Sequence, residues 1–141
     1  MASHDIRFFV GVTDNDWFAF LAKKRPDEVN FWRPGGRGQF RAIEANDLFL
    51  FKLHSPANAI VGGGFFVRYS LLPVSIAWTV FGEKNGVASH EDLLRKVLKY
   101  RRTNDQERDP TIGCLVLTSP FFWPEDEWLP APDDWHPNIV Q

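Results

Sequence analysis

The stretch "FWRPGGRGQFRAIEANDLFLFKLHS", from Phe31 to Ser55, joins a basic, Gly-rich segment to an apolar run. A Gly-rich turn between two apolar segments predicts a strand, a tight turn and a second strand. The turn pair Asn46-Asp47 then opens a further strand, which ends at His54 and Ser55. Two interpretations fit this mixture of residues: a turn alone, or the wall of a pocket for a flat, anionic ligand such as a nucleotide.

Around this stretch, the spacing of apolar residues predicts short strands and a few helices. The expected strands cover residues 6–13, 30–43 (with the turn inside), 46–55, 59–73 and 111–123. The expected helices cover residues 14–24, 73–82 and 86–103. The segment 73–82 could also be a strand, but a helix is favoured. The Pro- and Trp-rich end after residue 123 is expected to be irregular. Short strands in direct succession favour an α+β class with a small mixed or antiparallel barrel over a doubly wound parallel sheet.

Residue types at the ends of these elements support the assignment. Asp14 or Asn15 can cap the first helix, and Pro26 ends it. Ser89 can cap the last helix. The run Gly62–Gly64 inside a strand indicates a bulge or a close approach of another backbone.

Length and composition predict a single globular domain. The chain has 141 residues, of which 44% are hydrophobic, 24% charged and 15% aromatic. No apolar run approaches the roughly 20 residues of a membrane span, and the first residues do not resemble a signal peptide. The lone cysteine, Cys114, excludes an internal disulfide and favours a reducing compartment, so a cytoplasmic protein without a membrane partner is expected.

Charge is unevenly distributed along the chain. The net charge is −2, which argues against a generic nucleic-acid binder. However, residues 23–41 contain six Lys or Arg against two acids, whereas residues 119–141 contain five acids and no Lys or Arg. The basic segment could face phosphates, or its charges could form an ordinary solvated face.

The sequence lacks a recognisable catalytic set. Four scattered histidines form no metal-binding spacing, and Cys114 lies in an apolar strand typical of a core position. "VGGGFF" matches neither a dinucleotide-binding nor a phosphate-loop motif. The acids near the end lie between prolines, a poor frame for an acid–base pair. We therefore expect a binding protein rather than an enzyme, without a metal or a cofactor.

The order "IRFFVGV…DNDWFAFL…FWRPGGRGQFRAIEANDLFLFKLHSPANAIVGGGFFVR" resembles PUA-superfamily domains of the EVE/ASCH/SRA-like type. More narrowly, it resembles the N-terminal specificity domain of bacterial HNH-type, modification-dependent restriction endonucleases. The resemblance covers residues 6–70; beyond them it rests on general order and on the ending "PFFW…W…P…DWHPNIVQ". The segment "RPGGRGQ" differs from EVE relatives near the ligand pocket. The identity of the ligand therefore stays open.

The resemblance implies an α+β, PUA-like barrel with flanking short helices, formed by residues 1–141 as a single base-recognition domain. The implied partners are double-stranded DNA with a modified base, in particular modified cytosine, and a C-terminal HNH nuclease domain in a longer protein, which could also form a homodimer. Recognising such a base requires flipping it out of the duplex, at a cost of a few kcal/mol. Stacking in an aromatic pocket returns about 1–3 kcal/mol per base.

The candidate nucleic-acid- and base-binding residues are Trp17, Trp32, Arg33, Arg37, Gln39, His54 and Ser55. The two tryptophans would form pocket walls, unless they are simply core residues. The arginines could contact phosphates or be solvated, while the His54-Ser55 pair could recognise a base edge or cap a strand. The last helix carries further basic residues, namely Arg95, Lys96, Lys99, Arg101 and Arg102, which could flank DNA or form a solvated face.

Two alternatives to a DNA-binding domain stay open. An RNA-binding module of the same fold would stack an unpaired base without flipping it. A small-molecule or protein-interaction domain could use the same aromatic cleft.

Overall fold

The computed structural model describes residues 8–35, 43–101, 108–131 and 139–140. The strands are β1 (Phe8–Thr13), β2 (Glu28–Arg33), β3 (Leu48–Leu53), β4 (Ala59–Pro73), β5 (Thr111–Phe122), β6 (Leu129–Pro130) and β7 (Ile139–Val140). The helices are α1 (Asn15–Lys24), α2 (Val74–Phe81) and α3 (His90–Arg101), with two short 3-10 turns, η1 (Gly82–Asn85) and η2 (Glu125–Glu127).

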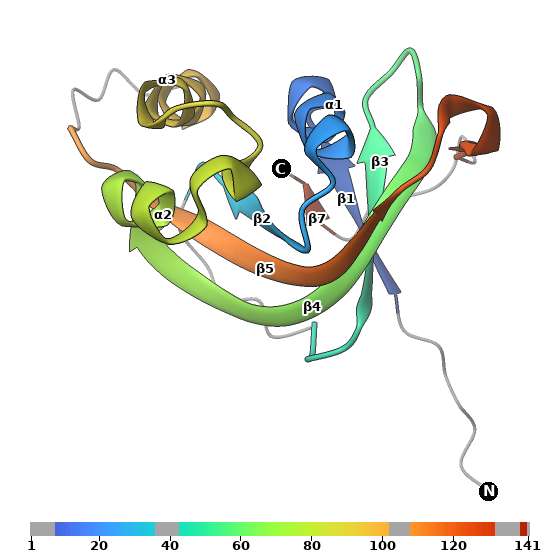
Figure 1. Ribbon diagram of the computed structural model, residues 1–141, viewed down its shortest axis with the longest axis horizontal. Coiled ribbons are helices and arrows are strands. Elements are labelled where there is room, and N and C mark those ends of the chain that lie inside the picture. Colours follow the sequence, from blue (N-terminus) through green and yellow to red (C-terminus); the bar gives the residue numbers. More distant parts are fainter. Residues whose placement is uncertain (1–7, 36–42, 102–107, 132–138, 141) are drawn as a thin grey trace, which may run out of the picture.

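The strands form one mixed sheet in the order β2-β5-β4-β3-β1-β7, and β6 pairs with β4. β1 is parallel to both β3 and β7, and the other pairs are antiparallel. The sheet curves strongly, and the three helices lie on its concave side (Figure 1). Among the described strands β2 and β7 each pair on one side only, so the α+β class is confirmed but the sheet is open rather than a closed barrel.

The curvature of the sheet has a local cause in β4. Its register against β5 shifts between Gly63 and Phe65 and again between Phe66 and Arg68. Such bulges increase the local twist and bend the strand. A Cβ on Gly62 would collide with the carbonyl oxygen of Phe121, so the neighbouring strand approaches closely. The predicted bulge and the predicted close approach are both confirmed.

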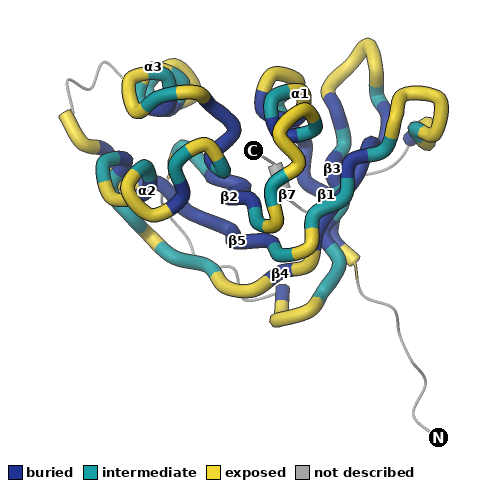
Figure 2. Tube along the Cα trace, viewed as in Figure 1, coloured by how far each residue is buried: buried dark blue, intermediate teal, exposed yellow. Residues whose placement is uncertain are grey.

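Aromatic side chains fill the space between the curved sheet and the helices. Trp17 packs edge-on against Phe31 and Phe51, with ring centroids 5.4 and 5.1 Å apart. All three side chains are fully buried. The buried segments follow the strands and the sheet-facing sides of the helices, while helix surfaces and loops are exposed (Figure 2). The high aromatic content of the chain is therefore used largely in its core.

The helix ends follow the local signals. The side chain of Asp14 caps α1 by accepting a hydrogen bond from the Trp17 backbone N–H at 3.0 Å. Ser89 caps α3 in the same way, through the Asp92 N–H at 3.1 Å. The segment 73–82, which could have been a helix or a strand, forms the helix α2. No described helix is long and apolar enough to cross a membrane.

The end of the chain differs from the expected irregular segment. After η2, β6 pairs with the start of β4, and β7 adds to the sheet beside β1. Two-residue strands have too little periodicity to be seen in a sequence, since their hydrogen bonds come from strands far away in the chain.

Candidate functional site

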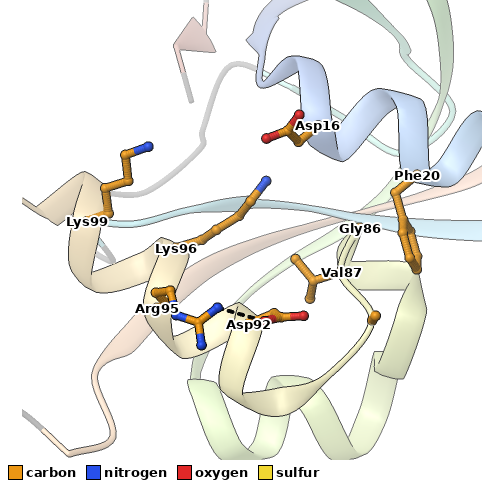
Figure 3. A pocket seen from close by; sticks show the side chains of 9 residues that line it. Asp16, Phe20, Gly86, Val87, Asp92, Arg95, Lys96 and Lys99 are labelled. Carbon is orange, nitrogen blue, oxygen red and sulfur yellow. Dashed lines mark hydrogen bonds and ion pairs between the residues drawn. The ribbon is translucent and has the colours of Figure 1, made fainter.

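A cleft of about 380 Å³ opens between α1 and α3 (Figure 3). This volume falls within the roughly 300–1,000 Å³ of typical small-ligand sites. Its charged lining residues are Asp16, Asp92, Arg95, Lys96 and Lys99. Its apolar lining residues are Phe20, Gly86, Val87 and Ala88. The cleft thus has an apolar base and a charged rim.

The base of the cleft is set by the contact between Gly86 and Trp17. Gly86 has a φ of +81°, a left-handed conformation that favours glycine. A Cβ at this position would collide with the Trp17 indole. The chain between η1 and α3 can therefore lie directly on the indole, and Trp17 supports the cleft from below without lining it.

The carboxylate of Asp14 joins α1 to α3 beside the cleft. Its Oδ2 accepts a hydrogen bond from the Lys96 ammonium at 2.6 Å, and its Oδ1 accepts one from the Tyr100 hydroxyl at 2.8 Å. Burial tends to raise the pKa of Asp14, but the hydrogen bonds from Lys96, Tyr100 and the Trp17 N–H, together with the Lys96 charge, leave this pKa lowered. Asp14 is therefore an anion at neutral pH and holds the two helices together.

Tyr100 responds to the same contact in the opposite direction. Burial, and then the hydrogen bond and charge of Asp14 with a contribution from Asp16, raise the pKa of Tyr100 to about 12. The phenol therefore stays protonated and continues to donate to Asp14. A second ion pair, between Arg95 and Asp92 at 2.9 Å, lies within the rim of the cleft.

The predicted aromatic walls are core residues, which corrects the expectation that they form an open pocket. Trp17 is 0% and Trp32 1% exposed. Their indole N–H groups donate to backbone carbonyls, of Asn30 at 3.3 Å and of Asn85 at 2.9 Å, respectively. Neither ring has a free face on which a base could stack. Of the two roles that the sequence left open, the structure favours the core.

The other candidates lie apart from the cleft or outside the described residues. Arg33, at the end of β2, is partly buried, and its charge opposes the rise that burial causes in the pKa of Tyr69. His54 and Ser55 are exposed in the turn between β3 and β4, and neither lines the cleft. Arg37 and Gln39 fall outside the described residues. The structure thus does not gather the described members of the predicted set into one site.

Cys114 behaves as the core residue that the sequence indicated. It is fully buried in β5. Burial raises the pKa of its thiol to about 11, despite an opposing hydrogen bond from Asn30. A neutral, inaccessible thiol is a poor nucleophile. Within the described parts of the chain, no group of three or more potential metal ligands occurs.

The α1 side of the cleft was not predicted from the sequence. The α3 side could have been predicted, because helical spacing places Asp92, Lys96 and Lys99 on one polar face of α3. By contrast, nothing in the local pattern around Asp16 and Phe20 indicates that this part of α1 lies opposite α3. That juxtaposition depends on the path of the strands between the two helices.

No protein-family model and no curated protein matches the chain. Solved structures do match it, and three of them are of an ASCH protein from Zymomonas mobilis. That protein itself has 10% sequence identity and a TM-score of 0.61, over 96% of this chain and 86% of the other. Its serine-to-alanine mutant has 11% identity and a TM-score of 0.52, over 84% and 75% of the two chains. Its tyrosine-to-phenylalanine mutant has 8% identity and a TM-score of 0.52, over 79% and 68%.

The chain therefore has the fold of an ASCH domain, of the PUA-like class. This likeness confirms the α+β, PUA-like fold that the sequence resemblance implied. The narrower likeness to restriction-endonuclease specificity domains has no counterpart among these three structures, and it stays a prediction.

Proposed function

We propose that this domain binds nucleic acid and accepts one unstacked base in the α1–α3 cleft. The observation that carries the proposal is the composition of the cleft: one aromatic ring, an apolar base, and a rim with three cations and two acids in about 380 Å³. A nucleotide has the matching parts, since its base is flat and its phosphate is anionic. The PUA-like fold supports the same class of ligand.

Phe20 supplies the stacking surface in this proposal. Its ring is partly buried on α1 and lines the cleft, so one side can receive a base. Stacking on an aromatic side chain contributes about 1–3 kcal/mol per base. Val87 and Ala88 offer apolar contacts for a substituent on the base, such as the methyl group of a modified pyrimidine. Phe20 thus takes the role that the sequence analysis gave to the buried tryptophans.

The specific ligand that we propose is a modified cytosine extruded from duplex DNA. Only an unstacked base can enter the cleft, and a duplex must therefore release it. The resemblance to specificity domains of restriction endonucleases supports this substrate, and it also supports a tethered HNH nuclease as partner. Arg33, Arg37, Gln39, His54 and Ser55 are proposed to contact the DNA outside the cleft.

The test compares three labelled probes of one sequence: a duplex with a single 5-methylcytosine, the unmodified duplex and the single-stranded RNA. We expect the wild type to prefer the modified duplex. Phe20→Ala should weaken that complex by about 1–3 kcal/mol and reduce the preference, because one stacking surface is lost. Phe65→Ala is the matched control, since Phe65 is a 37% exposed aromatic residue on β4 and does not line the cleft.

The three probes separate the alternatives. Tighter binding of the RNA than of either duplex would favour an RNA-binding module. Absence of binding to all three probes by a folded protein would refute nucleic-acid binding and favour a small-molecule or protein ligand.

A further inference from the structure

We propose that Asp16 and Lys99 select the ligand of the cleft: a nucleotide whose base carries an exocyclic amine, as cytosine and adenine do. This inference rests on the proposed function and adds the chemical class of base. It assigns the amine to Asp16 and the phosphate to Lys99.

The charges of the cleft are largely compensated within the protein. Arg95 pairs with Asp92 at 2.9 Å, and Lys96 pairs with Asp14 at 2.6 Å. The remaining two charges that line the cleft are Asp16 and Lys99. Neither has an oppositely charged partner among the residues that the structure describes.

These two residues face the cleft from different helices. Asp16 lies in the first turn of α1, and Lys99 lies in the last turn of α3 (Figure 3). The bonds from Asp14 to Lys96 and Tyr100 fix the two helices beside each other. Lys99 also lies 5.7 Å from the centre of the Tyr100 ring, which favours its position on this side of α3. The cleft thus presents an acceptor on α1 and a cation on α3.

This arrangement requires a ligand with donors at one end and an anion at the other. An ionised carboxylate only accepts hydrogen bonds, and an ammonium group only donates them. The amine of cytosine or adenine donates, and acidic side chains accept from the cytosine amine in base recognition. Thymine and uracil place a carbonyl oxygen at the same edge, which a carboxylate repels. A substituent at C5 of cytosine leaves the amine in place, so modified cytosine also satisfies the arrangement.

Calorimetric titration of the whole chain with dCMP, dAMP, dTMP and deoxycytidine tests this inference. We expect dCMP or dAMP to bind about tenfold or more tightly than dTMP, in line with the discrimination of a good base contact. The comparison of dCMP with dAMP shows which amine-bearing base fits better. Deoxycytidine should bind more weakly than dCMP because it lacks the phosphate.

Two variants assign the roles. Asp16→Asn should bring the dCMP and dTMP affinities close together, because an amide can donate to a carbonyl as well as accept from an amine. Lys99→Gln should weaken dCMP and dTMP alike and leave deoxycytidine unchanged. Asp27→Asn and Lys23→Gln are the matched controls, since they change the same charges at exposed positions outside the cleft and should change no affinity. Thermal melting of each variant confirms that it is folded.

The outcomes distinguish this inference from the proposed function. Equal binding of dCMP and dTMP by the wild type, an unchanged ratio in Asp16→Asn or no binding of mononucleotides would overturn the selection by Asp16. If the modified duplex still binds and Phe20→Ala still weakens it, the proposed function stands without this selectivity. If mononucleotides bind with the expected ratios but no duplex or RNA binds, the selectivity stands and nucleic-acid binding is refuted.

Discussion

Trp32 is the residue on which both packing and hydrogen bonding of one buried layer depend. Its indole donates to the carbonyl of Asn85, whose side chain accepts from Asn30 at 2.8 Å. The Asn85 amide in turn donates to the carbonyls of Ala77 and Gly82, at 3.1 and 2.8 Å. These bonds attach η1 to β2 and to the middle of α2. Removing one member leaves buried polar groups without a partner, which is costly.

We expect Trp32→Ala to lower the free energy of unfolding by about 3–5 kcal/mol, because it leaves a large cavity in the core. Trp32→Phe keeps most of the packing and loses the hydrogen bond, so its cost should be about 1–3 kcal/mol. Urea denaturation measures both. The phenylalanine variant should retain its nucleic-acid affinity. A folded Trp32→Phe protein that has lost its preference for modified DNA would instead support Trp32 as a pocket wall.

At the level of elements, the spacing of α1 and α3 depends on one carboxylate. Asp14 caps α1 and also binds Lys96 and Tyr100 of α3. The side chains of Asp14 and Lys96 are 19% and 22% exposed, so their pair is only partly screened by solvent. The two helices otherwise border the cleft. This link therefore sets the width of the proposed ligand site.

Asp14→Asn should keep the helix cap and lose the charge, because asparagine is also a good N-cap. At neutral pH we expect a loss of about 1–3 kcal/mol, typical of hydrogen bonds to a charged group. The pKa of Asp14 is lowered in the folded state, so its contribution is present above the usual value of 3.8 and disappears as the pH falls through the folded value. Acid denaturation curves of wild type and variant should therefore converge at low pH. Curves separated by a constant amount would contradict the role of the charge.

The same substitution should lower the pKa of Tyr100 from about 12 towards 10, since burial supplies the largest part of the shift, Asp14 a further part and Asp16 the remainder. The chain has two tyrosines, so ultraviolet titration in a Tyr69→Phe background isolates this phenol. An unchanged midpoint would show that Asp14 does not contact Tyr100 in solution.

On the scale of the whole molecule, charges that cluster in the sequence are partly neutralised in space. Lys24 lies 3.4 Å from Glu83, and Lys84 lies 3.3 Å from Asp27 and 3.7 Å from Glu28. With a net charge of −2, the protein gains little from long-range attraction to DNA. Binding then depends on a few unneutralised cations.

Arg37 is our candidate for a cation that contacts a phosphate, because glycines flank it in the basic segment. Arg37→Ala should weaken duplex binding equally for modified and unmodified DNA and make the salt dependence shallower by about one unit of slope. Lys24→Ala, whose charge is already paired, is the control and should leave the slope unchanged. If both variants keep the wild-type slope, Arg37 is solvated and does not contact a phosphate.

The local signals in the sequence were sufficient for much of the fold. Asp14 and Ser89 cap the helices as predicted, and the Gly62–Gly64 run marks the bulged strand. These features were predictable because a cap or a bulge is decided by residues within a few positions of one another. The resemblance added the PUA-like class, which the solved structures support at the level of the fold.

Only the tertiary structure decided the position of the site. The Asp14–Lys96 pair joins residues 82 positions apart, and the contact of Gly86 with Trp17 likewise joins separate elements. An amphipathic pattern places a tryptophan on the apolar face of its helix or strand. It does not show whether that face lines a pocket or the core, so the burial of Trp17 and Trp32 could not be predicted from it. By itself the sequence determined most of the longer strands and the helices, because their periodicity and end signals are local. The packing of distant segments determined the short strands β6 and β7 and which side chains meet at a cleft.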